Sequence, residues 1–274
     1  MTRYTWRTGL LELVMIAVTA VFAVPLWLLI STAFRTAPQI ARSPWGAPDF
    51  GDLSNFQTAW DQAWLGRAFV NSIVITVVAV AALVVLGAAA SYFFARSLRS
   101  WANRLFLLVV VGIMIPGQIG VLPLYRTFAQ LSMAGSTVSV ILFSVGTLLP
   151  FTVLLYTSFM RQLPTDYEEA ARIDGASSWQ AFRKVVIPLL LPVTGTVVIL
   201  DGVAIWNDFF TPLIYLNGTP NATLPVQIFT FVGDQTANWG AVFAGLLLAS
   251  LPMLILYLVF QRYVIRGFSG GLRG

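Results

Sequence analysis

The sequence contains no cysteine and no histidine, and it has few charged residues. Without cysteine there are no disulfides and no thiolate nucleophile. Without histidine there is no imidazole for acid–base catalysis or for the usual zinc and haem ligand sets. Charged residues make up 10% of the 274 residues, whereas a soluble domain carries about 25%. Because hydrophobic side chains make up 58%, the composition predicts an integral membrane protein.

Apolar runs long enough to cross a bilayer, about 20 residues in a helix, recur along the chain. Five runs carry no charge, and a sixth, 189–214, contains Asp201 and Asp208. We therefore expect an all-α fold with six transmembrane helices. A cleaved signal peptide is the alternative for the first run, but that run exceeds the usual apolar core of about 7–15 residues. The five uncharged runs are 13–34, 68–95, 105–125, 137–160 and 235–261.

The distribution of arginine and lysine predicts the orientation in the membrane. If the N-terminus is cytoplasmic, only four of the 16 basic residues fall in external segments: Arg35, Arg42, Arg67 and Arg126. Cytoplasmic loops of membrane proteins carry an excess of basic residues. We therefore expect both termini in the cytoplasm.

The loop 163–192, on the cytoplasmic side in this orientation, predicts two short helices outside the lipid. Thr165 and Glu168 have the spacing of a capping box, in which each side chain accepts a hydrogen bond from an amide at the helix start. Gly175 supplies a left-handed residue that ends the first helix. A second short helix follows, and the residues expected to cap or end it are Ser177, Ser178, Pro188 and Pro192.

Four residues of the first short helix share one face because they lie at positions i, i+3, i+4 and i+7. They are Tyr167, Ala170, Ala171 and Asp174. The two alanines allow close approach of another backbone. The pattern fits packing against the chain's own membrane helices and docking of a cytoplasmic partner equally well.

The same loop resembles a known sequence motif. Glu169-Ala170-Ala171, then Gly175, then Val185 to Pro188, is similar to the EAA loop of the membrane subunits of bacterial ABC importers, written EAA-x3-G-x9-I-x-L-P. Val185 and Ile187 replace the isoleucine and leucine of that pattern, and both changes are conservative. The segments 206–209, 223–226 and 261–274 resemble the carbohydrate branch, in particular the shorter permease of the maltose type. The resemblance runs from Asn71 to the C-terminus.

The resemblance implies a type I importer permease in a bacterial inner membrane, with a division into 1–67, a core 68–264 and a cytoplasmic tail 265–274. It implies a second homologous permease, two copies of an ATP-binding subunit and an extracytoplasmic sugar-binding protein as partners. It also implies that a short coupling helix carries closure of the ATPase to the membrane helices. The residues that match this coupling helix are Tyr167, Glu168, Glu169, Ala170, Ala171, Asp174 and Gly175.

The chain lacks the residues needed to hydrolyse ATP through a Walker A loop, which ends in Gly-Lys-Ser/Thr. Its one lysine, Lys184, lies between Arg183 and Val185. We therefore expect no catalytic residue, metal or cofactor in this chain, with ATP and Mg²⁺ bound by the partner ATPase. An intramembrane enzyme is disfavoured because histidine, cysteine and a G-x-S-x-G motif are absent.

Polar residues at membrane depth are candidates for a substrate pathway. Asp201 and Asp208 are seven residues apart, so we expect them on one helix face, about 10 Å apart along the axis. Carboxylates, amides and aromatic rings suit sugar hydroxyls and C–H faces. The alternatives are a helix cap at Asp208, a contact of Asp201 across the permease pair, a place for Trp206 in the aromatic belt and a helix–helix hydrogen bond at Gln118. The pathway candidates are Gln118, beside the helix-breaking Pro116, with Asp201, Trp206, Asn207 and Asp208.

The last external loop carries Asn217, Gly218, Thr219 and Pro220. The resemblance implies that this loop reaches into a docked binding protein, and a plain connector is the alternative. Two other transporters remain as functional alternatives. One is an ion-coupled secondary transporter, although the sequence has no internal repeat to support it. The other is an importer of a polyol or glycerol phosphate, and the lack of basic residues within the spans argues against a phosphorylated substrate.

Overall fold

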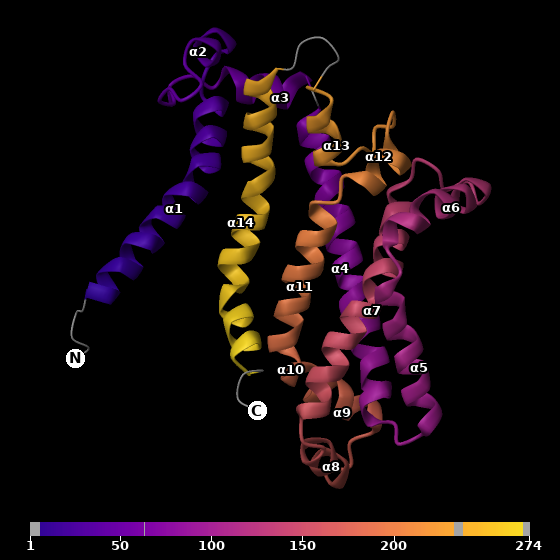
Figure 1. Cartoon of the computed structure of the whole chain (residues 1–274). Helices are drawn as coiled ribbons and strands as arrows, with labels where there is room; N and C mark the ends of the chain where they lie inside the picture. The colour runs from indigo at the N-terminus through magenta and orange to yellow at the C-terminus, as the bar shows by residue number, and fades with distance from the viewer. Residues whose placement is uncertain (1–5, 63, 233–237, 271–274) are drawn as a thin grey trace. The chain divides into compact units, whose positions relative to one another are not determined.

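The computed structural model describes residues 6–62, 64–232 and 238–270, and within these residues the secondary structure is helical, without a strand (Figure 1). Four helices are long and apolar enough to span a membrane, and two further pairs of helices qualify together but are bent at a short break. Counting each bent pair as one span gives six, as the sequence predicts. The four long helices are α1 (Trp6–Ala33), α4 (Leu65–Arg96), α7 (Thr137–Gln162) and α14 (Trp239–Gly270).

The chain divides into two compact units, and the first comprises residues up to 66 together with 227–251. It holds α1, α2 (Ala37–Arg42), α3 (Ser54–Gln62) and the start of α14. The end of α1 is tied down by side chains. Arg35 is buried and donates to the carbonyls of Ser43 and Pro44, while Asn55 Nδ2 donates to the carbonyls of Ala33 and Arg35. These bonds satisfy carbonyls that a helix end leaves without an intrahelical partner.

The second unit, 67–226 with the chain from 252 onward, contains the candidate sites. In this unit α4 packs closely on α7. Gly87 lets these helices approach closely, since a Cβ atom added there would lie 2.6 Å from Thr152 Cγ2. One turn further along, Ser91 Oγ donates to the carbonyl of Val153 at 3.0 Å. Gly87 and Ala88, both buried, therefore serve close packing of the two helices.

The predicted third span is broken at Pro116. α5 (Ser100–Val111) continues into the short turn η1 (Gly112–Met114), and α6 (Gly117–Gln130) leaves at an angle of 96°. The run 105–125 is therefore not one straight helix, because proline lacks the amide that would continue the hydrogen-bond ladder.

The predicted span 189–214 is also shorter than expected. α10 (Ile187–Leu189) and α11 (Leu191–Trp206) meet at a bend of 69° around Pro188 and Pro192. α11 ends at Trp206, and a separate helix, α12 (Phe210–Leu216), follows. Asp208 lies in the break between the two helices, where its Oδ1 accepts a hydrogen bond at 3.2 Å from the amide of Thr211 in the first turn of α12.

Candidate functional site

The loop 163–192 forms a helix–turn–helix at one end of the second unit, opposite α12 (Figure 1). Its first helix is α8 (Asp166–Ile173), and Gly175 follows with φ +84°, the left-handed conformation that the sequence predicts. Ser177 Oγ accepts from the amide of Gln180 and thereby caps α9 (Ser178–Ala181). A π-helical turn, η2 (Phe182–Val186), then leads back towards α10.

The capping box predicted at Thr165 and Glu168 is absent. The Thr165 side chain makes no capping bond, and Glu168 is 4% exposed. Glu168 instead accepts hydrogen bonds from two residues of α4: Arg96 Nε donates to Oε1 at 2.7 Å, and the Tyr92 hydroxyl donates to Oε2 at 2.9 Å. A charged donor binds a carboxylate more strongly than a neutral backbone amide does, so the distant arginine prevails over the local cap.

Arg96 also binds the end of α7. Its Nη1 donates to the carbonyl of Met160 at 3.1 Å, and its Nη2 donates to the carbonyl of Leu163 at 3.2 Å. These carbonyls belong to the C-terminal end of a helix, where the helix dipole favours a cation. One guanidinium group therefore joins the ends of α4 and α7 to α8.

The rest of the predicted coupling face is largely exposed. Glu169, Tyr167, Ala170 and Asp174 are exposed and Ala171 is half-buried. Packing of this whole face against the chain's own helices is therefore not observed. Two apolar side chains of the same loop are exposed although the sequence pattern did not predict it: Ile173 is 86% exposed and Trp179 is 66% exposed. The signal that could have identified them is their apolar character in a loop outside the lipid.

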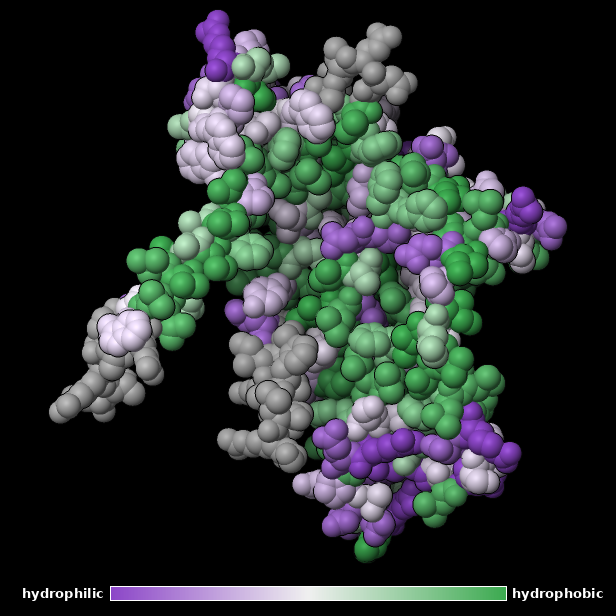
Figure 2. All heavy atoms as spheres, in the orientation of Figure 1, coloured by the Kyte–Doolittle hydropathy of each residue, from purple (hydrophilic) through white to green (hydrophobic). Residues whose placement is uncertain are grey.

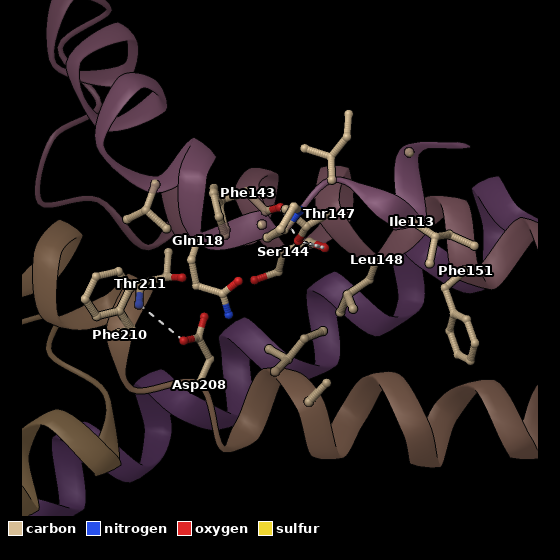
Figure 3. A pocket seen from close by; sticks show the side chains of 17 residues that line it. Ile113, Gln118, Phe143, Ser144, Thr147, Leu148, Phe151, Asp208, Phe210 and Thr211 are labelled. Carbon is tan, nitrogen blue, oxygen red and sulfur yellow. Dashed lines mark hydrogen bonds between the residues drawn. The ribbon is translucent and has the colours of Figure 1, made fainter. Parts of the chain in front are cut away.

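A cavity of about 440 Å³ lies at the break between α5 and α6. Gln118 and Asp208 face one another across it (Figure 3). The hydroxyls of Ser144, Thr147 and Thr211 add polar groups to its wall, and three phenylalanine rings add apolar surface. The aromatic lining residues are Phe143, Phe151 and Phe210.

The other three pathway candidates do not line this cavity. Asp201 is 1% exposed, and its Oδ2 accepts from Thr152 Oγ1 on α7 at 2.8 Å. The expected common face of Asp201 and Asp208 is wrong because α11 ends between them. Trp206 is buried, with its ring edge-to-face with Phe69 at 5.9 Å, so it does not belong to an exposed aromatic belt. Asn207 is exposed and donates to a carbonyl of its own helix.

The loop 217–220, predicted to be external, is fixed at its base. Thr219 Oγ1 donates to the carbonyl of Leu216, which closes a turn directly after α12. Asn71 Nδ2 on α4 donates to the carbonyls of Pro220 and Ala222 at 3.2 and 3.1 Å, and Asn221 Nδ2 donates to the carbonyl of Gly135. The residues of the loop that remain exposed are Asn217, Gly218 and Pro220, with Thr219 half-buried.

Metal ligands do not gather in the described part of the chain: it contains no group of three or more acidic side chains close enough to hold an ion. Hydrophilic residues are concentrated at another place in the second unit. Figure 2 shows hydrophilic residues concentrated at the end of the second unit that carries α8. The candidate site thus has two parts. One is the charged, exposed helix pair α8 and α9, and the other is the cavity at the broken span, where Asp208 is the one charged residue among the described lining residues.

Long apolar helices, two broken spans, a polar cavity beside a break and an exposed helix pair define a helical membrane transport protein. The chain belongs to the family described as the binding-protein-dependent transport system inner membrane component, which matches residues 84–270. This membership confirms the predicted importer family.

Relatives agree with this assignment over most of the chain. The melibiose/raffinose/stachyose import permease protein MelC of Bacillus subtilis (strain 168) is 34% identical over 249 residues, which cover 90% of each chain. The diacetylchitobiose uptake system permease protein NgcG of Streptomyces coelicolor (strain ATCC BAA-471 / A3(2) / M145) is 31% identical over 248 residues, covering 90% of this chain and 82% of that protein.

A solved structure has the same fold. It is the crystal structure of a bacterial ABC transporter involved in the import of the acidic polysaccharide alginate, and one of its chains superposes with a TM-score of 0.82 at 19% identity. The match covers 96% of this chain and 99% of that one. The all-α importer-permease fold expected from the sequence is therefore confirmed.

Proposed function

We propose that this chain is one of two membrane-spanning permease subunits of an ATP-driven importer, and that its cargo is a carbohydrate without a phosphate group. An ATPase partner binds ATP and Mg²⁺ and supplies the energy, and an external binding protein delivers the sugar. This chain provides half of the pathway and no catalytic residue. The exposed α8 and α9 dock on the ATPase and pass its closure to the membrane helices.

The observation that carries the carbohydrate assignment is the lining of the cavity. One carboxylate, one amide and three hydroxyls offer hydrogen-bond partners for sugar hydroxyls, while phenylalanine rings suit the C–H faces of a sugar. Both relatives described above bear the names of oligosaccharide permeases. These two lines of support are independent, because one rests on geometry and the other on sequence.

The charge of the lining favours an unphosphorylated cargo over glycerol phosphate. Among the described residues that line the cavity none is basic, and Asp208 is acidic. A phosphate group would need arginine or lysine to compensate its charge. An acidic sugar would meet the same repulsion from Asp208.

The proposed orientation of the chain in the membrane rests on the basic residues at the end of the second unit that carries α8. The ends of α4, α5 and α7 beside α8 carry four arginines, namely Arg96, Arg99, Arg104 and Arg161. Because basic loops stay in the cytoplasm, we place α8 and the C-terminus there and the loop 217–220 outside, where it meets the binding protein. An ATPase on the cytoplasmic side then faces Tyr167 and its neighbours.

Affinity purification of the tagged chain in mild detergent tests the partners. We expect a second permease and a Walker-containing ATPase to co-purify, and the reconstituted complex to move sugars only when ATP and the binding protein are both present. Competition among neutral, acidic and phosphorylated sugars then identifies the class of cargo. A chain that purifies alone and moves solute along an ion gradient without ATP would overturn the proposal.

The variant Glu169→Lys tests the docking surface. Glu169 is an exposed carboxylate on α8, so reversal of its charge should reduce the amount of ATPase that co-purifies while leaving membrane insertion intact. Arg104→Gln, on an exposed side chain of α5, is the matched control for a charge change at the same end. Equal ATPase recovery with both variants would contradict docking through α8.

A further inference from the structure

Two adjacent glutamates on α8 have opposite environments. Glu169 is exposed, whereas the Glu168 side chain is 5% exposed and lies 2.7 Å from Arg96 Nε, whose side chain is 17% exposed. Each oxygen of the Glu168 carboxylate has its own donor, Arg96 for one and Tyr92 for the other. Glu168 is therefore turned into the protein, and its neighbour is left for a partner.

We infer that Arg96 and Glu168 are the positioning residues that fasten the coupling helix to the two helices it must move. This inference rests on the proposed function and deepens it, since it names the internal connection through which closure of the ATPase reaches the pathway. The pair, together with the Tyr92 hydroxyl and the carbonyls of Met160 and Leu163, is called here the clamp.

The clamp connects three elements through one rigid group. The guanidinium of Arg96 is planar, so its bonds to Glu168, Met160 and Leu163 hold their directions relative to one another. Little solvent reaches the pair, which keeps the attraction strong. A displacement of α8 therefore carries the ends of α4 and α7 with it.

The second arm of the loop is attached by packing. The Phe182 ring lies 4.8 Å from the Tyr92 ring, and Phe182, Val186 and Leu190 join Tyr156 and Met160 of α7 in one buried cluster. Apolar contacts of this kind are not directional. The return arm thus adds cohesion, whereas the hydrogen bonds of the clamp fix the angle at which α8 leaves the unit.

α7 extends from the clamp to the cavity. Met160 accepts from Arg96, while Thr147 and Ser144 line the cavity on the same continuous helix. Thirteen residues separate Met160 from Thr147, or about 20 Å of helix at 1.5 Å per residue. A rotation imposed on α7 at the clamp therefore changes the position of the cavity wall.

The test compares charge-removing variants of the clamp in the complete reconstituted importer. For Glu168→Gln and Arg96→Gln we expect the ATPase still to co-purify and ATP still to be hydrolysed, but sugar moved per ATP to fall roughly tenfold, a typical size for coupling between sites. The variant that carries both substitutions should have a ratio of sugar to ATP little lower than that of Arg96→Gln alone, because each substitution removes the same connection between Arg96 and Glu168. Arg104→Gln should leave the ratio unchanged. A wild-type ratio in Glu168→Gln would overturn the inference.

If Arg96 and Glu168 only stabilise the fold, a different result is expected. It would lower the yield of folded protein, ATP hydrolysis and transport in proportion, so the ratio of sugar to ATP in the purified complex would not move. Arg96→Lys separates the two further, because lysine keeps the charge but lacks the fork that reaches both carbonyls. Partial recovery of the ratio by Arg96→Lys supports the clamp, and a ratio as low as that of Arg96→Gln contradicts it.

A distance measurement tests the clamp without altering it. Because the chain has no cysteine, spin labels attached to Ser97→Cys beside α4 and Asp166→Cys on α8 before the chain is assembled with its partners report only that pair of sites. We expect one unchanged distance in the nucleotide-free, ATP-bound and ADP-bound complex. A shift larger than the width of the distance distribution would overturn the clamp. Failure of the unlabelled wild-type chain to import with an ATPase would instead refute the proposed function.

Discussion

The two halves of α7 use polar side chains in opposite ways. In the half near α8, polar groups bond across to another helix: the Thr152 hydroxyl donates to Asp201, and the Tyr156 hydroxyl donates to Thr194 Oγ1 at 2.9 Å. In the other half, the Thr147 hydroxyl bonds back to the carbonyl of Phe143 in its own helix, and its side chain lines the cavity. The first arrangement ties helices together, and the second leaves acceptor lone pairs at a cavity wall.

This difference separates rigidity from recognition along one helix. The packed half is held by close approach and by bonds with fixed partners, so substitutions there should affect stability and the transmission of movement. The cavity half has room for a solute, so substitutions there should affect which solute is moved. Five substitutions test this division: one in the packed contact, one in the turn after α8, one at each of the two aspartates and one beside the loop 217–220.

The largest effect is expected for Gly87→Leu, which acts on the packed half. The new Cβ atom would lie 2.6 Å from Thr152 Cγ2, so α4 and α7 must separate or distort. Overpacking of this kind costs about 1–3 kcal/mol or more. Thermal unfolding in detergent should show a lower midpoint and a reduced folded yield. Ala89→Leu, at an exposed position of the same helix, should behave as wild type; equal losses from both would show that the close contact is not the cause.

A smaller effect is expected for Gly175→Val, which leaves both halves intact and strains the turn after α8. Gly175 has φ +84°, and no atom lies within 4 Å of an added Cβ, so the penalty is conformational, about 1–2 kcal/mol. Sugar moved per ATP should fall while insertion is retained. Gly175→Asn is the control because asparagine tolerates the left-handed region. If valine and asparagine give the same ratio, the turn does not set the position of α8.

The two aspartates sharpen the comparison directly. Asp208→Asn keeps an oxygen for the Thr211 amide but removes the charge from the cavity, so KM for sugar should rise by roughly tenfold, the difference between a charged and a neutral hydrogen bond. Asp201→Leu removes the hydrogen bond between α7 and α11 and leaves the Thr152 hydroxyl only the carbonyl of Leu148 in its own helix, so it should lower the unfolding midpoint and leave sugar preference unchanged. Competition assays measure the sugar preference of both variants, and thermal unfolding measures their stability. A change of sugar preference in Asp201→Leu would contradict the division of α7 into a packed half and a cavity half.

The smallest effect is expected for Asn71→Ala at the external loop. The change removes two hydrogen bonds to the carbonyls of Pro220 and Ala222, worth about 1 kcal/mol each. Limited proteolysis should cleave the loop faster, and the affinity for the binding protein should fall several-fold with ATP hydrolysis otherwise normal. Thr230→Ala, on an exposed side chain after α13 (Leu224–Phe229), is a control of similar size. Unchanged cleavage would show that Asn71 does not hold the loop.

Local rules predicted much of the fold. The turn at Gly175, the cap at Ser177 and the break at Pro116 each follow from a single residue's backbone preference, and the structure has all three. The close contact at Gly87 follows from a run of small residues. These features were accessible because each is specified within a few residues of sequence.

The errors come from partners far apart in the chain. The capping spacing of Thr165 and Glu168 was misleading because Arg96, 72 residues earlier, offers the stronger bond. The common face of Asp201 and Asp208 assumed an unbroken helix, although Asp208, which the sequence also offered as a helix cap, lies just beyond the end of α11 at Trp206. The exposure of Ile173 was also missed because burial depends on tertiary packing, although an apolar side chain in a loop outside the lipid could have indicated it.

The break at Pro116 has a consequence for how cargo preference can change over evolution. Gly112, Ile115 and Gly117 line the cavity where one helix ends and another begins, and helix ends leave main-chain amides and carbonyls without intrahelical partners. Main-chain carbonyls survive every substitution, and main-chain amides survive every substitution except proline, so this part of the wall persists while the sequence drifts. Selection for a new sugar then acts on a small set of neighbouring side chains, Gln118 and Asp208 foremost, against a permanent polar background.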